Sequence, residues 1–127
     1  MAGGAEKTVL VVDDDASLRM LCRVNLELDG YRVLEAGTKA EGAARLADGS
    51  IDAVLLDLHL GDGDGRDLLE SLGDQHPPVA LFTGFETIGP ELRALTEEVL
   101  PKPFGLEALR ATVGKLVAGR SEGDSAR

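Results

Sequence analysis

Aromatic residues are scarce in this sequence: they make up 3% of its 127 residues, and tryptophan is absent. Hydrophobic residues still amount to 43%, so we expect one compact domain whose core is mostly Leu, Val and Ala. The single cysteine, Cys22, excludes an internal disulfide and fits a reducing cytoplasm. A small buried residue on a helix is its expected role.

Long apolar runs and positive charge are also lacking. No run approaches the ~18 residues needed to span a bilayer, and the N-terminal MAGGAEK lacks the pattern of a signal peptide. The formal net charge is −10, with no basic cluster to offset it. An acidic surface repels nucleic acid and anionic membranes, so neither is expected as a direct partner.

What the sequence does contain is five short apolar runs separated by segments of helical period. The first, third and fourth runs are continuous, which is typical of parallel strands covered on both faces. This alternation predicts a three-layer, doubly wound α/β domain over residues 8–118, with flexible ends at 1–7 and 119–127. The five runs are Val9–Val12, Val33–Leu34, Ala53–Leu56, Val79–Phe82 and Val99–Leu100.

Local signals place the helices between these strands. The first is predicted over Ala16–Leu28, with Asp15 or Asp14 at its N-cap, and Thr38–Glu41 forms a capping box for the second. A third follows the Gly/Asp loop, Pro90 opens a short fourth, and an apolar stripe defines the last. The stripe consists of Leu106, Leu109, Val113, Leu116 and Val117.

Polar residues follow four of the five predicted strands. The first ends in Asp13, Asp14 and Asp15, the third in Asp57, the fourth in Thr83 and the fifth in Lys102. Ligands bind outside the carboxyl ends of the strands in such folds, so these groups are expected to meet at one rim.

The chemistry of this rim follows from its residue types. Clustered carboxylates repel one another unless a cation intervenes, and all-oxygen ligands favour magnesium over zinc. A carboxylate can act as a nucleophile toward phosphorus, and phosphoryl transfer needs mainly positioning and charge neutralisation. A metal, a lysine, a hydroxyl and backbone N–H groups would supply both.

Four motifs in this order resemble the CheY-like receiver domain of two-component response regulators, from about Thr8 to Val117. They are VLVVDDD, VLLDLHLGDGDG, FTG and LPKPF. Each motif alone is weak, but four that each close a different strand are highly specific. The resemblance implies a flavodoxin-like five-stranded parallel sheet of order 2-1-3-4-5.

The resemblance also implies a role for each site residue. Asp57 would accept a phosphoryl group from a phosphohistidine, and Lys102 would pair with Asp57 or its phosphate. Thr83 and the Gly84 amide would bind phosphoryl oxygens. Magnesium, or manganese, would be held by Asp14 directly, by Asp13 partly through water, by Asp57 and by the His59 backbone carbonyl. Lys102 would precede a cis bond to Pro103.

A signalling module rather than an enzyme is the function that this resemblance implies. It would promote its own phosphorylation and slow autodephosphorylation, and phosphorylation would switch the binding of a downstream protein. A sensor histidine kinase or a histidine phosphotransfer domain would be the donor. The location would be cytoplasmic, and the oligomeric state is left open between a monomer and a weak dimer.

Three departures from the receiver pattern stand out. Receivers commonly carry Tyr or Phe three residues before the lysine, where this chain has Val99. The short spacing between Thr83 and Lys102 implies a shortened fourth helix. Gly61 stands where a proline is often found. The combination of TGFE, a short fourth helix and VLPKPF resembles receivers attached to hybrid histidine kinases.

Other readings of the same residues remain open. A magnesium-dependent phosphatase with an aspartyl nucleophile is the main alternative, although such enzymes commonly place an acid where His59 stands. A relay module feeding a histidine phosphotransfer protein is another, and a receiver that is never phosphorylated is a third. A calcium loop and a dinucleotide site are disfavoured, since neither the EF-hand spacing nor GxGxxG is present.

Several polar residues have ordinary structural explanations. Asp15 is expected to cap a helix, and Asp62 and Asp64 to shape a tight turn. Asp52, at the start of its strand, is expected to be a solvated turn residue. The His59 side chain is expected to be a plain loop residue, and His76 a linker residue beside two prolines.

Overall fold

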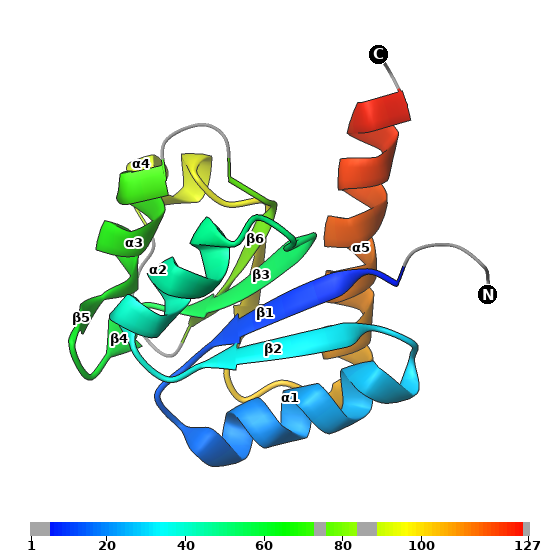
Figure 1. The fold of residues 1–127 in the computed structure, drawn as a ribbon, viewed down its shortest axis with the longest axis horizontal. Helices are drawn as coiled ribbons and strands as arrows, with labels where there is room; N and C mark the ends of the chain where they lie inside the picture. The colour runs from blue at the N-terminus through cyan, green and yellow to red at the C-terminus, as the bar shows by residue number, and fades with distance from the viewer. Residues whose placement is uncertain (1–5, 73–75, 84–88, 126–127) are drawn as a thin grey trace.

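The computed structural model describes residues 6–72, 76–83 and 89–125 (Figure 1). Five parallel strands form the central sheet in the order β2-β1-β3-β6-β7. This order is 2-1-3-4-5 when only the sheet strands are counted, which confirms the expected topology. The strands are β1 (Thr8–Val12), β2 (Arg32–Ala36), β3 (Ala53–Asp57), β6 (Val79–Thr83) and β7 (Glu98–Pro101).

Helices cover both faces of the sheet, as Figure 1 shows. On one face α1 and α5 pack on Val9 and Val11 of β1, while residues of α2 and α3 pack on Leu10 and Val12 from the other. Successive side chains of a strand point to opposite faces, so a continuous apolar run serves both layers. The helices are α1 (Ala16–Leu28), α2 (Lys39–Ala47), α3 (Gly65–Leu72), α4 (Pro90–Ala94) and α5 (Leu106–Ser125).

The predicted helix caps are present. The Asp15 carboxylate accepts hydrogen bonds from the Ser17 and Leu18 amides, at 2.9 and 3.3 Å. Thr38 Oγ1 accepts one from the Glu41 amide at 3.1 Å. The Glu41 carboxylate completes the box one residue early, because it accepts from the Gly37 amide at 2.7 Å instead of the Thr38 amide.

Two other predictions concern the core and the short helix. Cys22 is fully buried on α1, as expected, and burial, with the charge of Asp13 adding to it, raises the pKa of its thiol to about 12. The fourth helix is short, with five residues. Among the described residues, no helix is long and apolar enough to cross a membrane.

The structure departs from the sequence-based expectations in three places. A small antiparallel ribbon, β4 (His59–Leu60) and β5 (Gly63–Asp64), occupies the Gly/Asp loop. Helix α5 continues to Ser125, past the boundary predicted at residue 118; a glycine weakens a helix by only about 1 kcal/mol, and no proline interrupts this one. Asp52 is half-buried, and its carboxylate accepts from the Thr8 amide at 2.9 Å.

Candidate functional site

Three carboxylates converge at the carboxyl ends of β1 and β3. Asp13 and Asp14 follow β1, Asp57 ends β3, and carboxylate oxygens of the three lie within 4.8 Å of one another. Asp13 is fully buried, Asp57 is 7% exposed and Asp14 is exposed. The adjacency of β1 and β3 in the sheet explains the juxtaposition, since parallel neighbours end at the same edge.

Lys102 brings a positive charge to these carboxylates from the end of β7. Its Nζ lies 3.0 Å from Asp13 Oδ2 and 3.4 Å from Asp57 Oδ2. Burial alone would lower the pKa of Lys102, but its hydrogen bond to Asp13 and the charges of Asp13 and Asp57 outweigh burial and raise it. Lys102 is therefore a cation placed between two carboxylates.

Asp13 is the most enclosed member of this group. Burial raises the pKa of its carboxyl, against the lowering effects of the Asp15 amide and Lys102. Its Oδ1 accepts from the Asp15 amide at 2.9 Å, and its own amide donates to the Ala36 carbonyl at 3.0 Å. The carboxylate thus has a fixed orientation at the rim.

The Lys102 ammonium lies close to an aromatic ring. Phe82, which is buried in β6, stacks on Phe104 with the ring centroids 5.2 Å apart. Lys102 Nζ lies 5.5 Å from the Phe82 centroid, within the range of a cation–π contact. The Lys102–Pro103 peptide bond is cis, as the resemblance implies.

The main chain around Asp57 is packed tightly against the start of α3. The His59 amide donates to Asp57 Oδ1 at 3.1 Å, and the Gly65 amide donates to the Leu58 carbonyl at 2.8 Å. A Cβ atom added at Gly65 would lie 2.5 Å from the Asp57 carbonyl oxygen and 3.2 Å from Leu58 Cα. Sequence reasoning missed this requirement for glycine, because several glycines in the loop look alike.

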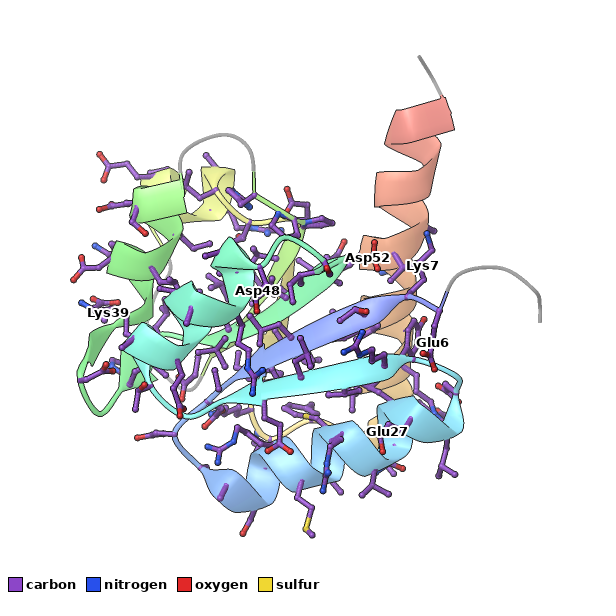
Figure 2. All side chains as sticks on the ribbon, in the orientation of Figure 1. Glu6, Lys7, Glu27, Lys39, Asp48 and Asp52 are labelled. Carbon is purple, nitrogen blue, oxygen red and sulfur yellow. The ribbon has the colours of Figure 1, made fainter. Side chains whose placement is uncertain are left out.

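The Gly/Asp loop is also tied to α2. Asp62 accepts from the Lys39 and Ala40 amides at 2.6 and 3.1 Å, which satisfies two free N–H groups at the helix start. The Lys39 side chain lies along Gly63, where an added Cβ would be 2.8 Å from Nζ, and Nζ lies 3.7 Å from Asp67. Figure 2 shows Lys39 beside the two-stranded sheet formed by β4 and β5. Asp62 is therefore more than a turn residue.

The stabilising effect of the contact between Asp62 and α2 should depend on pH. Hydrogen bonds from Lys39, and then from Ala40, lower the pKa of the Asp62 carboxyl below 3.8. A lowered folded-state pKa gives a stabilising contribution that is complete above the unfolded pKa and is lost as pH falls through the folded pKa. We expect a ¹³C NMR titration of Asp62 to show a midpoint below 3.8. A midpoint at or above that value would contradict the contact.

Four of the remaining predicted residues have described side chains, whereas the Thr83 side chain and Gly84 do not. Asp64 accepts from the Arg66 amide at 2.8 Å, a local turn role, and His76 Nδ1 lies 2.7 Å from the Pro77 carbonyl. The His59 side chain is exposed on β4, and Val99 is half-buried on β7. Thr83 closes β6 opposite Pro101, but its side chain and Gly84 lie outside the described part of the chain.

The donor set of the rim fits a hard divalent cation. Carboxylate oxygens from Asp13, Asp14 and Asp57 are the ligand type that magnesium prefers, and their spacing allows more than one of them to reach the same ion. The exposure of Asp14 leaves this side of the cluster open to solvent. Within the described part of the chain, neither sulfur nor imidazole contributes to this cluster, so a softer metal is disfavoured.

Comparison with known proteins supports the fold and the family. Residues 9–114 match the family model described as the response regulator receiver domain. The signal receiver domain of a putative Luxo repressor protein from Vibrio parahaemolyticus superposes with a TM-score of 0.88 over 97% of this chain and 98% of that one, at 22% identity. This likeness shows the fold.

Curated relatives are similar at the level of sequence. The KDP operon transcriptional regulatory protein KdpE of Escherichia coli is 36% identical over 107 residues, 81% of this chain and 48% of KdpE. The probable transcriptional regulatory protein TcrX of Mycobacterium tuberculosis is 32% identical over 111 residues, 84% of this chain and 47% of TcrX. The chain spans about half the length of these relatives. It belongs to the response regulator receiver domain family.

Proposed function

We propose that this chain is a phosphoacceptor domain that takes a phosphoryl group from a phosphohistidine onto Asp57. The observation that carries the proposal is the Lys102 ammonium, 3.0 Å from Asp13 and 3.4 Å from Asp57, in a group of three carboxylates. An Asp57 carboxylate oxygen attacks phosphorus as the P–N bond to the donor imidazole breaks. The electron pair stays on the imidazole nitrogen, and the product is an aspartyl phosphate.

Each residue at the rim would have its own role in this phosphoryl transfer. The His59 amide holds Asp57 Oδ1 at 3.1 Å, which orients the carboxylate, and Lys102 is placed to neutralise charge on the phosphoryl oxygens. Thr83 and the Gly84 amide would add hydrogen bonds to those oxygens. Asp13, Asp14, Asp57 and the His59 carbonyl would hold Mg²⁺ or Mn²⁺, which when bound offsets the negative charge of acceptor and phosphate.

The consequences for partners follow from this chemistry. A sensor histidine kinase or a histidine phosphotransfer domain would supply the phosphoryl group, and phosphorylation would shift a conformational equilibrium that controls binding of a downstream protein. Slow autodephosphorylation would reset it. A cytoplasmic location and a monomer or weak dimer remain predictions.

Two contexts for the domain differ in their support. The relatives named above are transcriptional regulatory proteins about twice as long as this chain, which favours a receiver that controls transcription through another part of a longer protein. The short α4 and Val99 are what favour the hybrid histidine kinase subtype instead. In that case the domain would relay phosphate to a histidine phosphotransfer protein.

A magnesium-dependent phosphatase with Asp57 as the nucleophile is the second candidate function. It would need a general acid to protonate the leaving group. Such enzymes commonly carry a carboxylic acid for this step where this chain has the exposed His59, and the family match over residues 9–114 supports the receiver function instead.

The proposal is tested by incubating the protein with acetyl phosphate, with MgCl₂ or with a chelator, and measuring its intact mass. We expect one phosphoryl group per chain with MgCl₂ and almost none with the chelator. The adduct should be lost on treatment with hydroxylamine, as an acyl phosphate is, and peptide mapping should assign it to Asp57. No adduct from acetyl phosphate or a panel of histidine kinases would contradict the proposal, and rapid turnover of many phosphomonoesters would favour the phosphatase.

A further inference from the structure

The side chain of Arg19, in the second turn of α1, contacts the main chain of Asp13 in the acidic cluster. Its Nη1 donates to the backbone carbonyl of Asp13 at 2.6 Å, and its Nε donates to Glu35 Oε1 at 3.1 Å. The side chain is 19% exposed, so both contacts are partly shielded from water. The guanidinium therefore joins the loop after β1 to the end of β2.

This contact completes the set of partners around Asp13. The amide of Asp13 donates to Ala36, its Oδ1 accepts from Asp15, its Oδ2 faces Lys102, and its carbonyl accepts from Arg19. The first three partners are set by the sheet, by the turn and by the lysine. Arg19 fixes the one remaining polar atom, which lies where the chain leaves the sheet and turns into α1.

The guanidinium of Arg19 lies against Gly37. A Cβ atom added at Gly37 would lie 3.0 Å from Nη1 and 3.4 Å from Cζ, so a side chain at that position would crowd the group. A hydrogen bond from a guanidinium to a carbonyl is charge-assisted and stronger than a neutral one. The planar fork lets one side chain bond Asp13 and Glu35 together, which an ammonium cannot do in the same way.

We propose that Arg19, oriented by Glu35, is a positioning residue for the cation site: it fixes the Asp13 main chain so that the Asp13 and Asp14 carboxylates are preorganised for Mg²⁺. The inference rests on the proposed function and deepens it. Groups that orient metal ligands commonly change metal affinity about 10–100-fold when they are removed.

Arg23 provides a matched control one turn further along α1. Its Nε lies 3.1 Å from Glu35 Oε2, although it is not oriented to donate a hydrogen bond, and the side chain is 39% exposed. Arg23→Gln removes the same charge from the same helix and the same carboxylate, while the contact between Arg19 and Asp13 remains. The pair of variants separates the Asp13 contact from the general loss of positive charge.

The test titrates the wild-type protein, Arg19→Gln, Arg19→Lys and Arg23→Gln with MgCl₂ and follows the Asp14–Ala16 amides by NMR. We expect Arg19→Gln to raise the Kd for Mg²⁺ about 10-fold, Arg19→Lys to have an intermediate effect and Arg23→Gln to change it less than about 2-fold. Without metal, the Asp15 amide should exchange faster in Arg19→Gln. Phosphorylation by acetyl phosphate should need more MgCl₂ for half-saturation but reach nearly the wild-type rate.

The outcomes distinguish the inference from the proposed function. Wild-type protein that binds no Mg²⁺ would count against the proposed function itself. Wild-type binding with an unchanged Kd in Arg19→Gln, or an equal loss in Arg23→Gln, would overturn the positioning role alone. If Arg19→Gln does not fold, Arg19→Lys decides: an unchanged Kd and unchanged Asp15 exchange in that variant would overturn the role as well.

Discussion

Asp57→Asn is expected to abolish phosphorylation by acetyl phosphate or a histidine kinase while leaving the protein folded. The amide oxygen of asparagine is a poor nucleophile, so the P–O bond does not form. The fold should persist because asparagine has the same shape, its oxygen can accept the His59 amide, and Lys102 keeps Asp13 as a partner at 3.0 Å. Intact mass gives the phosphorylation result, and thermal unfolding gives the stability.

Asp64→Asn is the matched control for this experiment. Asp64 lies on β5, seven residues after Asp57, is exposed, and accepts a hydrogen bond from the Arg66 amide at 2.8 Å, which an asparagine oxygen can also accept. We expect Asp64→Asn to be phosphorylated to the wild-type extent. An adduct that persisted in Asp57→Asn, or disappeared in Asp64→Asn, would place the acceptor at another residue.

Gly65→Ala is expected to destabilise the protein and to slow phosphorylation of Asp57. The added methyl would lie 2.5 Å from the Asp57 carbonyl oxygen, a main-chain atom that cannot turn aside as a flexible side chain can. Overpacking of this kind typically costs about 1–3 kcal/mol, and the backbone shift that relieves it would displace the Asp57 carboxylate. Each kcal/mol corresponds to a decrease in Tm of about 4 °C, measurable by thermal unfolding.

Gly61→Ala separates this steric effect from the general loss of a glycine. Gly61 lies in the turn between β4 and β5, four residues before Gly65, and has no positive φ; an added Cβ would have no atom of the described residues within 4 Å. We expect its Tm and its rate of phosphorylation to remain close to those of the wild-type protein. Equal losses in the two variants would show that the close approach at Gly65 is not the cause.

The sheet and the acidic cluster could be predicted because both depend on short-range patterns. Continuous apolar runs mark strands that are buried on both faces, and a carboxylate directly after such a run must lie at the rim. Asp13, Asp14, Asp57 and Lys102 come together for this reason, from the ends of three different strands. No knowledge of side-chain packing was needed to expect their convergence.

The features that could not be predicted depend on contacts between distant segments. Asp62 looks like any aspartate in a glycine-rich turn, and its acceptance of the Lys39 amide depends on how α2 is placed over the sheet. Gly65 cannot be told apart from Gly61 by composition, because only the nearby Asp57 carbonyl distinguishes them. The role of Arg19 likewise depends on the direction in which the chain leaves β1.

The bonds from Asp62 to α2 turn the intervening segment into a closed ring. Lys39 and Asp62 are 23 residues apart in sequence, and the strand that carries Asp57 lies between them. A non-covalent closure of this kind limits the separate movement of the segments that it joins, as a short loop does. A displacement of Asp57 is therefore expected to move the first turn of α2 as well. The Lys39 and Ala40 amides, which donate to Asp62, would then report the state of Asp57.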